Sequence, residues 1–277
     1  MFNVTANASS IPSLGFGTFR MPGSDVLRIV PHALKLGFRH VDTAQIYENE
    51  AEVGEAIANS GIDRHDVFLT TKVWVANYSH DKFISSVEDS LKKLKTDYVD
   101  LLLLHWPNDT VTLSDQIGAL NEVKEAGMAR HIGVSNFTTK LMAESIKLSK
   151  APLVTNQIEY HPYLNQNAVI AAAKNAGMAI TGYFGMADGK VFSDPTLIDI
   201  ASAHGKSVAQ IVLRWLIQQN DVIALSKTVS EARAAENIAI FDFELSADEM
   251  AVIHSLAKPD GRIVSPDGLA PVWDPIG

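Results

Sequence analysis

The chain repeats one local pattern eight times, and this repetition restricts its fold more than any other feature. Each repeat is a short apolar run followed by a longer stretch whose apolar residues are three and four positions apart. The short runs fit strands buried on both faces, and the longer stretches fit amphipathic helices. We expect strands at 14–19, 39–42, 67–71, 99–104, 131–135, 153–159, 178–183 and 222–226. Eight such units in about 230 residues predict a parallel sheet.

The ends of the expected helices carry recognisable signals. Glycines stand where four of them should end, because glycine readily adopts the left-handed conformation that closes a helix. Serine with glutamine or glutamate three residues later marks two of the starts, at Ser207 and Ser246. The helices are expected at 24–36, 49–59, 81–94, 114–126, 139–148, 166–176, 195–204, 208–219, 230–237 and 248–256.

A parallel sheet can be an open, doubly wound sheet or a closed barrel. The dinucleotide fingerprint of the open fold is incomplete here, because Gly15 and Gly17 are followed by Arg20 where a third glycine belongs. Gly189 also lacks a second glycine at the spacing of a phosphate-binding loop. The sequence therefore predicts an α/β fold, a (β/α)8 TIM barrel. We expect a single domain over residues 1–277, with a C-terminal substrate loop from about residue 259.

Composition excludes several classes of function. The 277 residues carry a formal charge of −9, which argues against nucleic acid and acidic membranes as partners. Cysteine is absent, so disulfides, thiolate metal sites and cysteine nucleophiles are excluded. No run approaches the ~18 apolar residues of a membrane helix, and residues 1–7 lack the features of a secretory signal. We therefore expect a cytoplasmic protein.

Ionisable side chains stand at the ends of three consecutive expected strands. Asp42, Lys72 and His105 each follow an apolar run, and Tyr47 comes five positions after the acid. Each has an ordinary explanation when taken alone: a turn cap, a lysine reaching water, a core histidine and a surface tyrosine. In a TIM barrel, however, the carboxyl ends of the strands form one mouth where active sites lie. Their joint placement favours a catalytic site.

The four groups suit protonation of a carbonyl oxygen. A phenol is a poor acid at neutral pH, with a reference pKa near 10, and a nearby ammonium should lower that value. Asp42 would keep the Lys72 ammonium charged in a partly dry site, and His105 could orient the carbonyl. None of these groups supplies electrons, so a cofactor must deliver hydride. Two alternatives remain: a barrel lyase forming a Schiff base on Lys72, and a nucleotide-sensing protein without turnover.

A second cluster favours a dinucleotide. Lys227, Thr228, Ser230 and Arg233 place two cations and two hydroxyls at the end of a strand and the start of a helix. This set suits the 2′-phosphate of NADP, although a solvated basic helix start explains it too. Four further residues could stack on a flat ring or bond a carboxamide: Tyr183, Ser135, Asn136 and Gln157. Three aromatic residues could line an apolar pocket, although core packing is the usual role of any one aromatic: Phe19, Trp74 and Trp106.

The ordered motifs of the chain resemble the aldo-keto reductase family over nearly its whole length. The matching segments are Gly15-Phe16-Gly17-Thr18, Asp42-Thr43-Ala44-Gln45-Ile46-Tyr47, Thr71-Lys72-Val73-Trp74, Asp97-Tyr98-Val99-Asp100-Leu101, His105-Trp106-Pro107, Gly133-Val134-Ser135-Asn136-Phe137, Asn156-Gln157-Ile158-Glu159, Lys227-Thr228, Arg233, Glu236-Asn237 and Phe241-Asp242-Phe243-Glu244-Leu245-Ser246. Within the family, residues 262–271 are similar to the closing stretch of bacterial 2,5-diketo-D-gluconate reductases.

The resemblance implies a TIM barrel that reduces aldehydes and ketones with NADPH, including 2,5-diketo-D-gluconate and small dicarbonyls. It implies Tyr47 as the acid, assisted by Asp42, Lys72 and His105. It also implies a set of residues that bind the cofactor: Gly17, Thr18, Ser135, Asn136, Gln157, Tyr183, Lys227, Thr228, Arg233, Glu236 and Asn237. The family uses no metal, and its bacterial members are mostly monomers. Two departures concern cofactor handling: Phe184-Gly185-Met186 replaces a common Ser-Pro-Leu, and Ser226 replaces a common proline.

Overall fold

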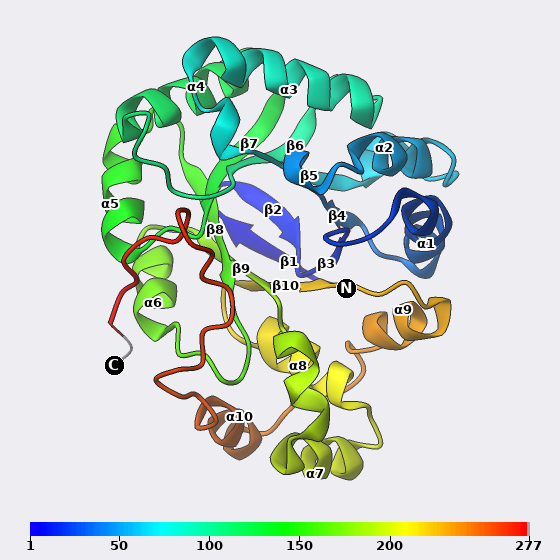
Figure 1. Cartoon of the computed structure of the whole chain (residues 1–277). Coiled ribbons are helices and arrows are strands. Elements are labelled where there is room, and N and C mark those ends of the chain that lie inside the picture. The colour runs from blue at the N-terminus through cyan, green and yellow to red at the C-terminus, as the bar shows by residue number, and fades with distance from the viewer. Residues whose placement is uncertain (276–277) are drawn as a thin grey trace.

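The strands of the computed structural model, which describes residues 1–275, form a closed barrel of eight parallel strands (Figure 1). The strands are β3 (Leu14–Gly17), β4 (His40–Asp42), β5 (Phe68–Val73), β6 (Val99–Leu104), β7 (Ala129–Ser135), β8 (Leu153–Glu159), β9 (Ala179–Tyr183) and β10 (Val222–Ser226). Each strand pairs with the next, and β10 closes the ring by pairing with β3, Ala224 opposite Leu14. The predicted (β/α)8 barrel is confirmed. Residues 276 and 277 of the expected domain lie outside the described residues.

Ten α-helices of residues 1–275 surround this barrel (Figure 1). They are α1 (Gly23–Leu36), α2 (Glu50–Ala58), α3 (His80–Leu94), α4 (Leu113–Glu125), α5 (Thr139–Leu148), α6 (Asn167–Asn175), α7 (Pro195–His204), α8 (Val208–Gln218), α9 (Glu231–Ile238) and α10 (Ala247–His254). Each lies within two residues of its expected bounds. Both expected capping boxes are present, and Gly37 ends α1 with a φ of 109°. None of these described helices has the length and hydropathy needed to cross a bilayer.

Side chains along each strand alternate between two buried environments. In β6, Leu102 and Leu104 join the large core between the strands and the helices, whereas Leu101 and Leu103 join a smaller core with Val154 and Ile223. Successive side chains of a strand point to opposite faces, so the smaller core fills the interior of the barrel. This double burial explains why the strands read as continuous apolar runs.

An amino-terminal hairpin closes one end of the barrel, and the sequence reasoning missed it. Strands β1 (Asn3–Ala6) and β2 (Ser9–Pro12) pair in antiparallel fashion through a two-residue turn. Asn7 and Ala8 in that turn both have positive φ, as such turns require. The Asn7 amide donates to the Leu153 carbonyl at 2.8 Å, at the amino end of β8. The carboxyl ends of the strands are therefore the end left for a ligand.

Candidate active site

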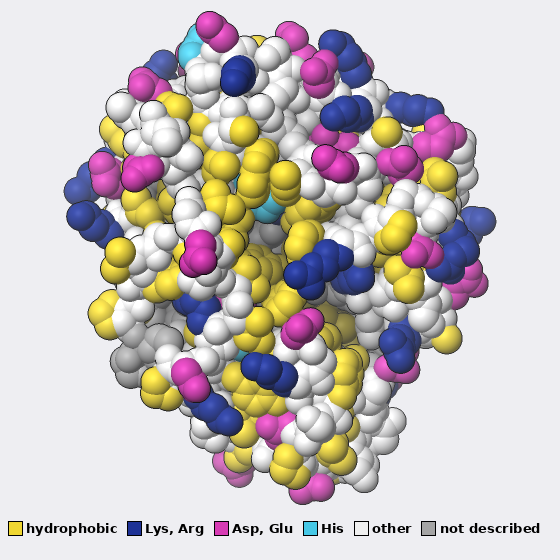
Figure 2. Space-filling model, in the orientation of Figure 1, with side chains coloured by type: hydrophobic (Ala, Val, Ile, Leu, Met, Phe, Trp, Pro, Cys, Tyr) yellow, Lys and Arg dark blue, Asp and Glu magenta, His cyan; other side chains and the backbone are white. Residues whose placement is uncertain are grey.

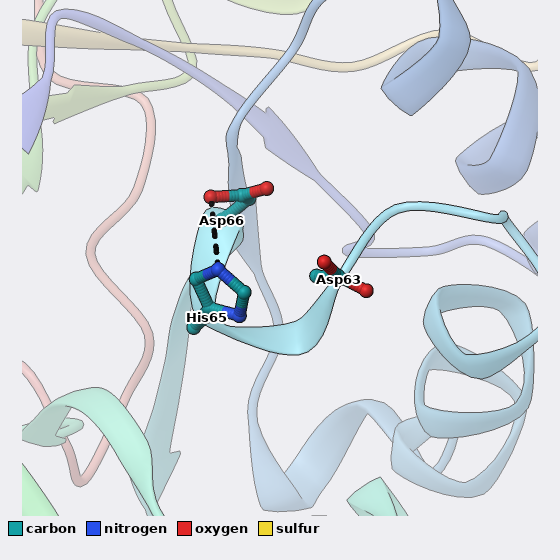
Figure 3. A group of neighbouring side chains, drawn as sticks. All are labelled: Asp63, His65 and Asp66. Atoms are coloured by element: carbon teal, nitrogen blue, oxygen red, sulfur yellow. Dashed lines mark ion pairs between the residues drawn. The ribbon is translucent and has the colours of Figure 1, made fainter.

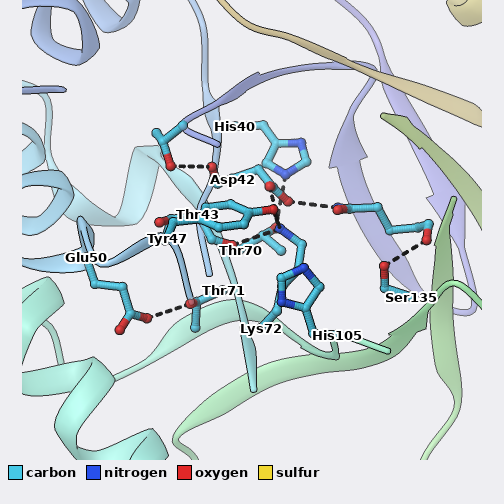
Figure 4. Close-up of polar contacts among 12 residues, drawn as sticks. His40, Asp42, Thr43, Tyr47, Glu50, Thr70, Thr71, Lys72, His105 and Ser135 are labelled. Carbon is cyan, nitrogen blue, oxygen red and sulfur yellow. Dashed lines mark hydrogen bonds and ion pairs between the residues drawn. The ribbon is translucent and has the colours of Figure 1, made fainter. Parts of the chain in front are cut away.

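Four ionisable side chains meet at the carboxyl ends of the strands (Figure 4). Asp42 is the last residue of β4, Lys72 lies near the end of β5 and His105 directly follows β6. Tyr47 lies on the short 3-10 helix η1 (Gln45–Tyr47), in the loop after β4. The Lys72 Nζ donates to Asp42 Oδ1 at 2.6 Å, to the Thr43 carbonyl at 2.8 Å and to the Tyr47 hydroxyl at 3.3 Å. The ammonium thus joins the carboxylate to the phenol.

The Asp42–Lys72 ion pair is buried, and additional hydrogen bonds stabilise its two charges. Asp42 is 2% exposed and Lys72 is 0% exposed, so neither charge is stabilised by bulk water. The second carboxylate oxygen of Asp42 accepts a hydrogen bond from the Gln157 amide at 2.8 Å. A buried pair of this kind needs such extra hydrogen bonds, because desolvation of two charges costs several kcal/mol per ion. Gln157 is therefore part of the charge network as well as a candidate cofactor contact.

Burial shifts the pKa values of Tyr47 and Lys72 toward the neutral form of each group. The pKa of Tyr47 lies well above the usual value, first because the phenol is buried and second because of the Asp42 charge. This corrects the expectation that Lys72 would lower the Tyr47 pKa. The expectation counted the ammonium but could not count the loss of water. Burial also lowers the pKa of Lys72, against the opposing effect of Asp42. Tyr47 therefore holds its proton throughout the neutral range.

His105 is held as a neutral imidazole beside the phenol. Burial lowers its pKa well below 6.5, and the Lys72 charge adds to this effect. Its ring lies 5.7 Å from the Tyr47 ring and 5.3 Å from the Trp74 ring, both edge to face. The buried Nδ1 has no hydrogen-bond partner among residues 1–275. An unpaired acceptor is tolerated better than an unpaired N–H, so the proton belongs on Nε2, where it can be donated to a ligand.

A connected set of amides and hydroxyls lies on the neighbouring strands β7, β8 and β9. The Ser135 hydroxyl donates to the Gln157 carbonyl at 2.8 Å, and the Asn136 amide donates to the His105 carbonyl at 2.9 Å. The Tyr183 hydroxyl donates to Asn136 Oδ1 at 2.7 Å. Asn136 holds a φ of 64°, which is unusual for a residue other than glycine and places its amide in this set. The Gln157 Oε1 has no donor among the described residues.

The predicted phosphate cluster lies at the junction of β10 and α9. Lys227 and Arg233 are exposed, and neither forms an ion pair within residues 1–275. Thr228 Oγ1 accepts from the Ser230 backbone N–H at 3.1 Å, and Ser230 Oγ accepts from the Arg233 backbone N–H at 3.4 Å. Both hydroxyls act as acceptors in these bonds, so each retains a hydrogen that can be donated. The cluster offers two charges and two O–H donors to an anion.

Other candidate cofactor residues have internal partners. Thr18 donates its hydroxyl to the Asp42 carbonyl at 3.0 Å, and Gly17 lies opposite Asp42 in the β3–β4 pairing. The buried Asn237 amide donates to Ser226 Oγ at 2.9 Å, and the carboxylate of Glu236 accepts from Ser207. Ser226 therefore fastens α9 to the end of β10, which gives a structural role to the residue that departs from the family pattern.

Arg28 on α1 approaches the phosphate cluster and was missed by the sequence reasoning. Its guanidinium donates to the Val229 carbonyl at 2.7 Å and to Asp25 at 2.9 Å, and it lies 3.5 Å from Glu231. Nothing near Arg28 in the sequence signals this approach, because the contact spans 201 residues. Arg28 has carboxylate partners, whereas Lys227 and Arg233 have none within residues 1–275.

The three aromatic residues predicted to line the pocket differ in how far they are exposed. Phe19 is 44% exposed, and its ring lies 5.0 Å from that of Tyr47. Trp74 is half-buried, whereas Trp106 is buried and contacts Trp273 of the C-terminal segment at 6.3 Å between ring centroids. Figure 2 shows a hollow at the centre of this face with apolar side chains around it. The sequence reasoning did not include Trp273 among the pocket residues.

One further group of potential ligands lies at the other end of the barrel (Figure 3). Asp63, His65 and Asp66 flank the turn that precedes β5, and their ligand atoms lie within 4.8 Å of one another. His65 lies 3.5 Å from Asp66, and all three residues are exposed. An exposed cluster of this kind is common on protein surfaces, and it lies outside the strand ends where the four ionisable groups meet.

Comparison with known proteins shows the family of the chain. Residues 13–258 match the model of the aldo/keto reductase family. Methylglyoxal reductase DkgB of Yersinia pestis is 47% identical over 268 residues, which cover 96% of this chain and all of that protein. Morphine 6-dehydrogenase of Pseudomonas putida is 38% identical and covers 95% of each chain.

Solved structures resemble the barrel closely. A crystal structure reported as a candidate 2,5-diketo-D-gluconic acid reductase B has a TM-score of 0.98 and 64% identity, covering 99% of this chain and 98% of that one. An aldo/keto reductase from Brucella melitensis has a TM-score of 0.87 and 41% identity, covering 92% and 98%. The chain therefore belongs to the aldo/keto reductase family, and it is an oxidoreductase built on a TIM barrel.

Proposed function

We propose that the protein reduces aldehydes and ketones with NADPH, and that sugar-derived dicarbonyls such as 2,5-diketo-D-gluconate and other small dicarbonyls are its substrates. The observation that carries this proposal is the Lys72 ammonium, which contacts both the Asp42 carboxylate and the Tyr47 hydroxyl. The names of two similar proteins, a methylglyoxal reductase and a candidate 2,5-diketo-D-gluconic acid reductase B, support dicarbonyls as the substrate class.

The residues at the mouth fit a nicotinamide dinucleotide phosphate. Gln157 Oε1 has no donor among residues 1–275 and can accept a hydrogen bond from a carboxamide, and Tyr183, bonded to Asn136, offers an aromatic ring. Lys227 and Arg233 have no carboxylate partner among the described residues, so their charges are available to a 2′-phosphate. When bound, the cofactor supplies the hydride that the protein's own groups cannot provide.

In the proposed mechanism, Tyr47 donates a proton to the carbonyl oxygen of the substrate. Its raised pKa ensures that the proton is present, and the Lys72 ammonium, 3.3 Å away, stabilises the phenolate left behind. His105 donates its Nε2 hydrogen to the same oxygen and fixes the direction of the carbonyl. Asp42 keeps Lys72 charged and in place through the 2.6 Å bond.

The contacts of Lys72 favour this mechanism over a Schiff-base lyase. Its nitrogen donates to three oxygens, those of Asp42, Thr43 and Tyr47. Attack on a carbonyl needs a free lone pair on a neutral amine, and the partnered ammonium has none. Borohydride trapping of a substrate on Lys72 would reverse this preference. A nucleotide-sensing protein would bind NADPH tightly but reduce no member of a carbonyl panel.

The lowered His105 pKa leads to a prediction on pH. With saturating NADPH and an uncharged aldehyde, kcat/KM should show no inflection near pH 6.5, the ordinary pKa of imidazole. His105 is neutral above its folded-state pKa, which burial holds well below 6.5, so the imidazole does not change charge between pH 7.5 and 6.5. Initial rates across pH 5.5–8 check this. An inflection between pH 6 and 7 that disappears in His105→Asn would contradict it.

Arg233 should discriminate between the two nicotinamide cofactors. We expect Arg233→Ala to weaken NADPH by about 1.5–3 kcal/mol, the range for a charged hydrogen bond, and to leave NADH nearly unchanged. Nucleotide fluorescence titrations give both dissociation constants, and a panel of aldehydes and ketones assayed with each nucleotide tests the reductase activity itself. Arg28→Ala is the matched control, because that guanidinium already pairs with Asp25.

Equal losses of NADPH and NADH affinity in Arg233→Ala would mean that the phosphate site lies elsewhere. An equal loss of NADPH affinity in Arg28→Ala would indicate a general effect of surface charge. If the wild-type protein reduces no carbonyl compound with either nucleotide, the proposed function itself is wrong.

A further inference from the structure

We propose that Arg262 forms an anion subsite in the substrate pocket and selects carbonyl substrates that carry a carboxylate. This inference rests on the proposed reductase function and specifies the substrate class of the same site. It derives from the C-terminal segment, residues 259–275, which runs from α10 past the ends of β8 and β9 toward α5 (Figure 1).

A buried carboxylate at the end of β8 fastens this segment. Glu159 is 0% exposed, and its two oxygens accept from the backbone N–H groups of Ile263 at 2.7 Å and Val264 at 2.9 Å. His161 Nε2 donates to the same carboxylate at 2.9 Å. The backbone on the carboxyl side of Arg262 is therefore fixed to the barrel, and so is the position from which its side chain starts.

A second carboxylate fastens the far end of the segment. Asp274 accepts from the backbone N–H of Thr139 at 2.8 Å and from its hydroxyl at 2.7 Å. This contact holds the neighbouring Trp273 in position, with its ring 3.7 Å from the Arg262 guanidinium carbon and 6.3 Å from Trp106. The guanidinium is thus stacked on one face by an aromatic ring that also covers a candidate pocket residue.

The Arg262 side chain is well ordered by these contacts but its hydrogen-bond donors are not used. Only 13% of the side chain is exposed, yet among residues 1–275 no atom accepts a hydrogen bond from its five N–H groups. The nearest carboxylate oxygen among residues 1–275, Glu159 Oε2, forms an ion pair with Arg262 Nη1 at 3.7 Å, which is too long for a hydrogen bond. Glu159 directs its oxygens to Ile263, Val264 and His161 instead. A largely buried guanidinium with unused donors is a site for an acceptor that residues 1–275 do not supply.

Trp273 links the Arg262 guanidinium to the pocket residue Trp106, and the Arg262 charge also acts on Tyr183 of the mouth. Burial and the Glu159 charge raise the pKa of Tyr183, Tyr47 adds to the rise, and Arg262 opposes it. The Tyr183 hydroxyl is thus within electrostatic range of both Tyr47 and Arg262. In a protein with a formal charge of −9, Arg262 is a local source of attraction for an anion at this side of the mouth.

The surroundings of Arg262 favour a carboxylate over a phosphate. The planar fork of the guanidinium matches the two oxygens of a carboxylate. Glu159 and Asp274 also act on the Arg262 charge, so two negative groups stand nearby. They would repel a dianionic phosphate more strongly than a singly charged carboxylate. Keto acids and aldehyde acids, including acids derived from sugars, therefore fit the site best.

Comparing each acid with its methyl ester shows whether Arg262 recognises the carboxylate of the substrate or only stabilises the fold. We expect the wild-type protein to reduce 4-carboxybenzaldehyde and succinic semialdehyde with a higher kcat/KM than their methyl esters. In Arg262→Met the acid-to-ester ratio should fall about 10-fold or more, mainly through KM of the acid, as loss of a charge-assisted hydrogen bond requires. Arg262→Lys should keep a higher ratio than Arg262→Met, because it retains the charge but not the fork.

Arg20→Met provides the matched control. Arg20 is an exposed cation after β3, with its guanidinium carbon 5.1 Å from the Phe19 ring, and its removal should leave the ratio unchanged. The proposed subsite would be refuted if Arg262→Met kept the wild-type acid-to-ester ratio of kcat/KM. An equal loss of activity with acid and ester would indicate a structural role for Arg262. An equal fall of the ratio in Arg20→Met would also overturn the subsite. If Arg262→Met does not fold, the comparison of Arg262→Lys with the wild type decides. Absence of any carbonyl reduction by the wild type would instead reject the proposed function.

Discussion

The Tyr47→Phe variant should lose about 10²–10⁴ in kcat, the range for removal of a positioned general acid. The phenol oxygen accepts from the Lys72 ammonium at 3.3 Å and retains its proton because burial raises its pKa. Phenylalanine keeps the ring and its 5.0 Å and 5.7 Å contacts with Phe19 and His105 but removes the O–H group. The measurement is kcat at saturating NADPH with an uncharged aldehyde, alongside the NADPH dissociation constant, which should stay close to the wild-type value.

A second tyrosine provides the control for this substitution. Tyr98 precedes β6 at the opposite end of the barrel, where Arg130 and Arg64 lie over its ring at 3.9 Å and 4.5 Å. Tyr98→Phe removes a hydroxyl of the same kind away from the mouth and should leave kcat within about twofold. Full turnover in Tyr47→Phe would assign the proton donor to another group, with His105 next in line.

The barrel could be predicted because its pattern is local and repeated. Each strand is an apolar run, each helix has its caps within the same segment, and Ser207 with Gln210 or Ser246 with Glu249 needs no distant partner. The amino-terminal hairpin was missed for the opposite reason. Its strands have only four residues each, and Val4 and Ile11 are buried by Leu101 and Ile223, which are far away in the chain. The turn at Asn7 was the one local signal of this hairpin.

The candidate site also has one part that the sequence predicts and one part that it does not predict. The strand-end rule brought Asp42, Lys72 and His105 together because parallel strands end at one mouth whatever their separation in sequence. No such rule predicts that Glu159 binds Ile263 and Val264, a contact across 104 residues that depends on the path of the C-terminal segment. Trp273 as a pocket residue and Arg262 as an anion subsite could be proposed only once the path of the C-terminal segment was known.

The expectation of a lowered Tyr47 pKa was wrong for a physical reason. The sequence identifies which charges can meet, so it correctly paired a phenol with an ammonium. It does not give the amount of water that remains around them. In the structure desolvation and the Asp42 charge both raise the pKa of Tyr47, although the Lys72 ammonium lies 3.3 Å from its hydroxyl. The ammonium is therefore expected to act chiefly after proton transfer, when the phenolate exists.

Replacing Asp42 should affect stability as strongly as the Tyr47 change affects turnover. The Lys72 ammonium is 0% exposed. In Asp42→Asn it keeps its hydrogen bonds to the Thr43 carbonyl and the Tyr47 hydroxyl. It loses the only carboxylate of the described residues that lies at hydrogen-bond distance. An uncompensated buried charge costs about 3–5 kcal/mol, so the free energy of unfolding should fall by that amount at pH 7. Denaturant unfolding followed by circular dichroism measures this change.

The double variant Asp42→Asn/Lys72→Met shows whether the unpaired charge is the cause. Removing both partners leaves no buried charge, so most of the lost free energy of unfolding should return while activity does not. pH gives an independent check, because burial already lowers the Lys72 pKa below 10.5 and loss of Asp42 should lower it further. Between that lowered value and 10.5, the unfolded chain binds the lysine proton and the folded chain does not, so stability of the single variant should rise with pH. Equal stability of the single and double variants, with no rise toward pH 10, would show that Lys72 does not depend on Asp42 for its charge.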